Sequence, residues 1–135
     1  MTPKPAAHHE ESISIVLGDP HELVLDGLDR ILLDQRGVNV VGRCTDARSA
    51  IELIAELRPR MAVLDLRLPT VGAIGVAREL KRRHISTTTL VLLASELGDH
   101  EFLEAIRADF ARIMLKEMPS KLLIQCIRKM ASNES

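Results

Sequence analysis

Short, uninterrupted apolar runs alternate along the chain with segments in which apolar residues recur every three or four positions. The runs are rich in leucine and β-branched residues and lack strict polar alternation, which predicts strands buried on both faces of a parallel sheet. The predicted strands are 13–17, 38–43, 61–65, 89–94 and 112–115. The remaining spacing predicts helices at about 20–35, 46–58, 72–84, 99–108 and 119–131. In the first helix the expected buried stripe is Val24, Leu28, Ile31 and Leu32.

Strict alternation of strands and helices is typical of an α/β fold with helices on both faces of the sheet. Five strands suit a flavodoxin-like (βα)5 doubly wound parallel sheet of strand order 2-1-3-4-5 better than a barrel. The first strand–helix turn, GDPH at 18–21, is not rich in glycine, which argues against a dinucleotide-binding domain. Asp46 and Asp99 stand just before helical segments and are expected to be N-caps.

The chain's 135 residues fit one domain. We expect residues 1–12 to form a disordered tail, 13–131 the folded domain and 132–135 the start of a linker. Net charge of −1 gives no electrostatic basis for direct nucleic-acid contact, and the basic run at 81–84 ends a helix, where cations complement the dipole. No apolar run approaches the roughly 20 residues of a membrane helix. Cys44 and Cys126 lie in apolar segments, as reduced thiols of a cytoplasmic protein do.

Three charged residues follow or end predicted strands. Asp19 follows the first strand, Asp65 ends the third and Lys116 follows the fifth. In the order 2-1-3-4-5 the first and third strands are neighbours, so both carboxylates share one pocket at the carboxyl ends of the strands. A lysine or a hard metal ion would offset their repulsion, and the set suits a carboxylate nucleophile that accepts a phosphoryl group. The alternative to such a site is that the three residues are ordinary polar side chains that face solvent in the loops at the strand ends.

Several short motifs resemble the receiver domains of bacterial two-component response regulators, particularly those that precede LuxR-type DNA-binding domains. The resemblance covers about residues 13–130, and its strongest part is AVLDLRLP at 62–69. The other similar motifs are Asp19-Pro20-His21, Gly27-Leu28, VVG at 40–42 and MLKE at 114–117. The resemblance implies that Asp65 is the phosphoacceptor, that Asp19 and Asp65 hold Mg²⁺, and that Lys116 contacts the phosphoryl group. It also implies a sensor histidine kinase as partner.

Parts of the family's switch are missing. Pro20 replaces the second member of the acidic pair, so the affinity for Mg²⁺ is expected to be weakened. The family's hydroxyl residue of the fourth strand corresponds to Ala94. Ser95 is one residue on, and alternation along an extended chain would turn it the other way. Ile113 replaces the fifth-strand aromatic residue, and the loop at 70–74 lacks the usual acidic-Gly pair.

Two functions share this fold. The first is a phosphoacceptor switch in which a histidine kinase phosphorylates Asp65 and a dimer or DNA-binding output domain responds. The second is a pseudo-receiver, a dimerisation or interaction module that does not depend on phosphate. A small α/β enzyme is a third reading, but no nucleophile elbow, catalytic His–acid arrangement or flavin-stacking aromatic pair supports it, so we expect no enzyme.

Two helices carry more apolar residues than one stripe can bury. The first helix adds Leu23, Leu25 and Leu33 to its core stripe. The last helix carries Leu122, Leu123, Ile124, Cys126, Ile127 and Met130. An exposed apolar patch usually marks an interface, so we expect a homodimer through the first or the last helix.

Overall fold

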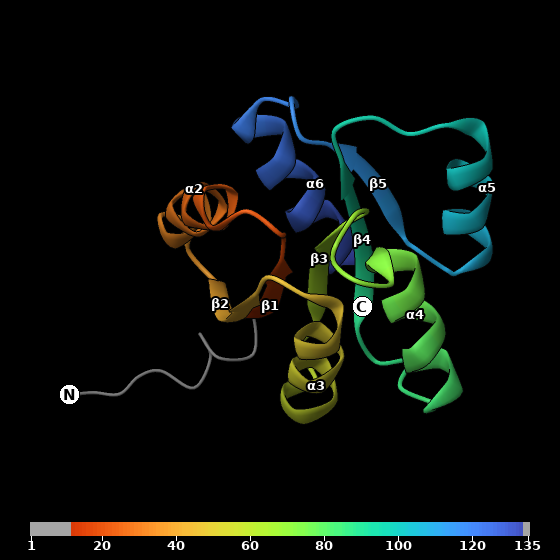
Figure 1. Ribbon diagram of the computed structural model, residues 1–135. Coiled ribbons are helices and arrows are strands. Elements are labelled where there is room, and N and C mark those ends of the chain that lie inside the picture. Colours follow the sequence, from red (N-terminus) through yellow and green to blue (C-terminus); the bar gives the residue numbers. More distant parts are fainter. Residues whose placement is uncertain (1–11, 134–135) are drawn as a thin grey trace.

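A computed structural model of the chain describes residues 12–133, so the predicted tail up to residue 11 lies outside the described residues, as do residues 134 and 135. Strands and helices alternate throughout this range (Figure 1). The strands are β1 (Ile13–Gly18), β2 (Val38–Cys44), β3 (Met61–Asp65), β4 (Thr89–Ala94) and β5 (Arg112–Leu115). The helices are α2 (Glu22–Leu33), α3 (Ala47–Leu57), α4 (Gly72–Arg82), α5 (Asp99–Arg107) and α6 (Ser120–Asn133). Within 12–133, no helix combines the length and apolar character needed to cross a bilayer.

All five strands form one parallel sheet in the order β2-β1-β3-β4-β5. The predicted flavodoxin-like α/β fold and its strand order are therefore confirmed. The register pairs Gly18 with Leu64, Asp65 with Leu93 and Ala94 with Leu115. This alignment brings the carboxyl ends of β1, β3, β4 and β5 to one edge of the sheet.

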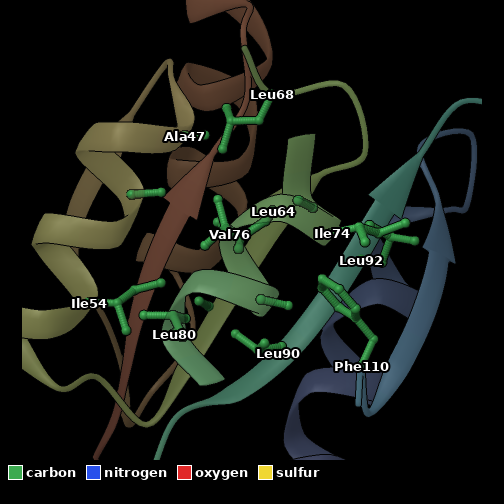
Figure 2. Close-up of a cluster of buried hydrophobic side chains, with 14 of the residues drawn as sticks. Ala47, Ile54, Leu64, Leu68, Ile74, Val76, Leu80, Leu90, Leu92 and Phe110 are labelled. Atoms are coloured by element: carbon green, nitrogen blue, oxygen red, sulfur yellow. The ribbon is translucent and has the colours of Figure 1, made fainter. Parts of the chain in front are cut away.

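Alternate side chains of each strand enter two separate apolar layers. On one face, α3, α4 and α5 cover a cluster that includes Leu64, Leu92 and Phe110 (Figure 2). On the other face, α2 and α6 cover a cluster that includes Met61 and Val63. Burial of both faces explains why the strands read as continuous apolar runs instead of alternating ones.

The two predicted N-caps have different outcomes. Asp46 caps α3, because its carboxylate accepts a 2.7 Å hydrogen bond from the Ser49 main-chain N–H. The prediction for Asp99 is wrong: Gly98 is the N-cap of α5, and Asp99 is the first helical residue. The reason is that Glu101 reaches back one turn, and its Oε1 accepts a 3.0 Å hydrogen bond from the Gly98 N–H.

Exposed apolar side chains are distributed differently from the sequence prediction. Leu25, expected beside the buried stripe of α2, is itself buried, whereas Leu23 and Leu33 are exposed. On α6, Leu122 is the large apolar residue that is exposed. The predicted patches did not include α5, where Phe102, Leu103 and Ile106 are each about half exposed, or Leu115 of β5, which is exposed to a similar degree.

Candidate functional site

Asp19, Asp65 and Lys116 meet at the carboxyl edge of the sheet. The Lys116 Nζ atom lies 2.8 Å from Asp19 Oδ2 and 2.8 Å from Asp65 Oδ1. Asp19 and Asp65 are the buried charged residues of the described chain, with exposed fractions of 0% and 4%. One ammonium group therefore contacts two carboxylates that are buried away from solvent.

Close backbone packing holds Asp19 in this position. Its N–H donates a 3.1 Å hydrogen bond to the carbonyl oxygen of Cys44, which ties the end of β1 to that of β2. A Cβ atom on the preceding Gly18 would lie 2.9 Å from Leu64 Cδ2, so glycine lets β1 and β3 pack at this edge. Asp19 Oδ1 accepts a 2.9 Å hydrogen bond from the His21 main-chain N–H, and the His21 ring lies 3.4 Å away.

Asp65 starts a tight turn that fixes its carboxylate. The Leu68 N–H donates to the Asp65 carbonyl oxygen at 3.2 Å, and the Arg67 N–H donates to Asp65 Oδ2 at 2.8 Å. An aspartate that accepts from the backbone two residues on is a common turn element. The Leu66 N–H donates to the Leu93 carbonyl oxygen at 2.8 Å, which anchors the turn to β4. Asp65 Oδ1 is left to face the ammonium group.

The positive and negative charges of the site do not cancel. Burial alone would lower the pKa of Lys116, but the adjacent Asp19 and Asp65 outweigh it and raise the pKa above its ordinary value. Lys116 is therefore a cation at neutral pH. With two carboxylates and one ammonium, the core of the site carries one net negative charge, which a further cation would offset.

The donor set fits a hard divalent cation. Asp19 Oδ2 is buried, and the Lys116 ammonium group lies 2.8 Å from it. Mg²⁺ in proteins commonly uses one or two carboxylates and completes its shell with water and phosphate oxygens. Among residues 12–133, no group of three or more His, Cys, Asp or Glu side chains is arranged to hold a metal. Asp19 and Asp65 thus suit Mg²⁺ as a sparse set of ligands.

The substituted switch positions lie around this site. Pro20 directly follows Asp19 and offers no ligand atom in its side chain. Ala94 is buried at the end of β4 against the larger apolar cluster, whereas Ser95, the alternative source of a hydroxyl, is exposed. Ile113 is partly buried and packs on the same cluster. Neither Ala94 nor Ile113 has a polar side-chain atom.

Arg67 and Glu101 extend the site beyond the residues that the sequence analysis identified. The guanidinium of Arg67 lies 3.9 Å from Glu101 Oε2 at the start of α5, while its backbone N–H binds Asp65. No periodicity or motif marks this pair in the sequence, because the contact depends on how the turn after β3 approaches α5. Arg67 lies two residues after Asp65, and this short separation is the feature of the sequence that could have identified Arg67 as part of the site.

The chain resembles known proteins over nearly all of the described residues. The profile of the response regulator receiver domain family matches residues 15–128. The transcriptional regulatory protein DegU of Brevibacillus brevis is 28% identical over 124 residues, which cover 91% of this chain and 52% of DegU. The chain thus spans about half the length of the curated relatives it matches.

Solved structures give the same result. The signal receiver domain of the response regulator NarL from Mycobacterium tuberculosis superposes with a TM-score of 0.84 at 28% identity, covering 90% of this chain and 97% of that one. A two-component response regulator of the LuxR family from Aurantimonas sp. SI85-9A1 superposes with a TM-score of 0.83 at 27% identity. The match covers 90% of this chain and 86% of the LuxR-family protein.

Proposed function

The chain belongs to the family of response regulator receiver domains, signalling modules of two-component systems, and on this premise we propose that a sensor histidine kinase phosphorylates it on Asp65. The observation that carries the proposal is the 2.8 Å contact between Lys116 Nζ and the buried Asp65 Oδ1. A cation beside the acceptor carboxylate stabilises negative charge on an incoming phosphoryl group.

The transfer is a substitution at phosphorus. A carboxylate oxygen of Asp65 forms a bond to the phosphorus of a phosphohistidine as the P–N bond breaks, and the electron pair goes to the imidazole nitrogen, which takes up a proton. Lys116 offsets the charge on the transferred group, and the Arg67 N–H keeps the carboxylate oriented. Positioning and electrostatics supply most of the catalysis in such transfers.

Asp19 and Asp65 would hold Mg²⁺, which when bound neutralises charge on the phosphoryl oxygens. Pro20 removes a carboxylate that the family usually has at this place, so we propose that the ion binds more weakly than in an ordinary receiver. Lys116 occupies part of the space between the two carboxylates and carries more of the charge compensation as a result.

We also propose that the phosphorylated domain acts in the cytoplasm, by dimerising or by controlling a DNA-binding output domain, and is not itself an enzyme. The likeness to a LuxR-family response regulator, together with the coverage of about half the length of DegU, supports an output domain. The exposed Leu23 and Leu33 of α2 and Leu122 of α6 support a homodimer through one of these helices.

A pseudo-receiver is the second candidate. Pro20, Ala94 and Ile113 favour it, because each removes a group that acts on the metal, the phosphoryl group or the response while the scaffold stays intact. In this function the domain would present its dimer or partner surface whatever the state of Asp65.

Intact-mass spectrometry after incubation with acetyl phosphate and Mg²⁺ separates the two functions. A phosphoryl adduct on the wild type that is absent from Asp65→Asn would support a working acceptor. Light scattering on the same samples would show whether the adduct changes the oligomeric state. No adduct, across Mg²⁺ concentrations that label an ordinary receiver, would contradict the phosphoacceptor proposal and leave the pseudo-receiver.

A further inference from the structure

We propose that Arg67 is a second cationic contact for a phosphoryl group on Asp65, and that its transfer from Glu101 to this group releases the first turn of α5. The inference rests on the proposed phosphorylation of Asp65. It adds a set of contacts, the Arg67 route, through which a phosphoryl group on Asp65 would change the position of helix α5.

Arg67 is connected to both ends of this route. Its main-chain N–H donates a 2.8 Å hydrogen bond to Asp65 Oδ2, so the start of its side chain is held beside the acceptor carboxylate. Its guanidinium lies 3.9 Å from Glu101 Oε2, at the outer limit of an ion pair. A single residue thus touches the acceptor with its backbone and α5 with its side chain.

The two possible partners of the guanidinium differ in strength. The pair with Glu101 is long and solvent-exposed, with 68% of the Arg67 side chain and 33% of the Glu101 side chain accessible. Such pairs contribute little to stability. A phosphoryl group carries more charge and offers several acceptor oxygens, which arginine binds in a bidentate, charge-assisted manner. Lys116 is already shared between two carboxylates, so the added charge favours recruitment of Arg67.

Helix α5 is anchored weakly enough to respond. Ala105 is the single buried residue among Asp99–Arg107. Among residues 12–133, two ion pairs join the helix to the α4 side of the domain: Arg67 with Glu101, and Arg78 with Glu104 at 3.1 Å. Loss of the first pair removes the attachment of the helix at its N-terminal turn. Glu101 can still cap the helix through Gly98, so we expect displacement of the turn without unfolding of α5.

The substituted switch residues of β4 and β5, Ala94 and Ile113, offer no other path of polar contacts from Asp65. Ala94 and Ile113 have apolar side chains, so they cannot pass a change at Asp65 outward through hydrogen bonds. The output of the Arg67 route is the position of Phe102, Leu103 and Ile106, whose half-exposed side chains on α5 would move with the turn.

Amide hydrogen exchange across 98–107, measured with and without acetyl phosphate and Mg²⁺ on samples whose adduct is quantified by mass, tests the inference. Phosphorylation of the wild type should speed exchange at the start of α5 by about twofold, because the contact that is lost is a weak, exposed ion pair. Arg67→Gln should produce the same increase without phosphate, and no further increase when labelled. Glu101→Gln, which keeps a side-chain oxygen for the Gly98 N–H, should behave in the same way.

Arg78→Gln is the matched control. It breaks an ion pair to the same helix at a position outside the site, so it should raise basal exchange yet keep the full response to labelling. A labelled wild type with unchanged α5 exchange, or a labelled Arg67→Gln protein that responds as the wild type does, would overturn the Arg67 route while leaving phosphorylation of Asp65 intact. Absence of an adduct on the wild type would overturn both proposals.

Discussion

The Lys116 main-chain N–H donates a 2.8 Å hydrogen bond to the carbonyl oxygen of Ala94, which locks the ends of β4 and β5 together at the candidate site. The side chain of Lys116 reaches the two carboxylates from this point, while Ala94 contributes only a methyl group. The position that lacks a hydroxyl is therefore tied directly to the lysine that would bind the phosphoryl group.

Ala94→Ser should speed phosphorylation by acetyl phosphate. A hydroxyl at this place can donate to a phosphoryl oxygen, and one such hydrogen bond of about 1.4 kcal/mol corresponds to about tenfold in rate. The rate of adduct formation in a mass-spectrometric time course measures the effect. Ala94→Cys is the control of equal size with a much weaker donor, and equal rates for the two variants would show that the hydroxyl is not the missing group.

Pro20→Asp should tighten Mg²⁺ binding. It adds a third carboxylate next to Asp19, and we expect the dissociation constant to fall by about tenfold for one added charged ligand. The chain has no Trp or Tyr, so amide chemical shifts in an NMR titration are a better readout than intrinsic fluorescence.

Pro20→Asn separates the charge from the loss of the proline ring. The asparagine has similar size and one neutral oxygen, so it should leave the affinity for Mg²⁺ near that of the wild type. Equal tightening by asparagine and aspartate would mean that proline acts through the backbone of the loop before α2.

The architecture could be predicted because the pattern that encodes it is local. Each predicted strand agrees with an observed one to within one residue, since burial on both faces turns a parallel strand into a continuous apolar run. Five strands in strict α/β alternation suit a flavodoxin-like sheet, and the strand order of that fold places Asp19 and Asp65 on adjacent strands. These features follow from chain order and periodicity.

What could not be predicted depends on contacts between distant segments. Glu101 takes the capping role expected of Asp99, and Arg67 reaches α5 across the site, because loop geometry sets both contacts. The exposed apolar surface was sought on the first and last helices. Much of it lies on α5, because this short helix buries only Ala105 and leaves its larger apolar residues near the surface.

Two glycines should respond to alanine with opposite signs. Gly72 has a φ of +74°, and a Cβ there would lie 2.7 Å from the Leu66 carbonyl oxygen, so Gly72→Ala should destabilise the fold by about 2–3 kcal/mol. Gly27 lies within α2 with nothing within 4 Å of its added Cβ, so Gly27→Ala should stabilise by about 0.5–1 kcal/mol. Urea unfolding followed by far-UV circular dichroism measures both, and a destabilised Gly27→Ala would contradict the open surroundings of this position.

Lys116→Gln should lower the free energy of unfolding by about 3 kcal/mol, because it leaves two buried carboxylates without their shared cation. The pKa of Lys116 is raised in the folded state. Its contribution to stability is therefore complete below the unfolded-state value of about 10.4 and is lost as the pH rises through the folded-state value. The difference between wild type and Lys116→Gln should stay constant from about pH 7 to pH 9.5 and shrink above about pH 10.4.

Urea titrations of both proteins across this pH range measure that difference, and Asp65→Asn provides the background that isolates the electrostatic part. With one carboxylate neutralised, Lys116 has less repulsion to offset, so its replacement by glutamine should cost less than in the wild type by about 1–2 kcal/mol. Equal costs in the two backgrounds would mean that Lys116 stabilises the fold through packing of its methylene chain. The ammonium group would then be free to serve the phosphoryl group without holding the site together.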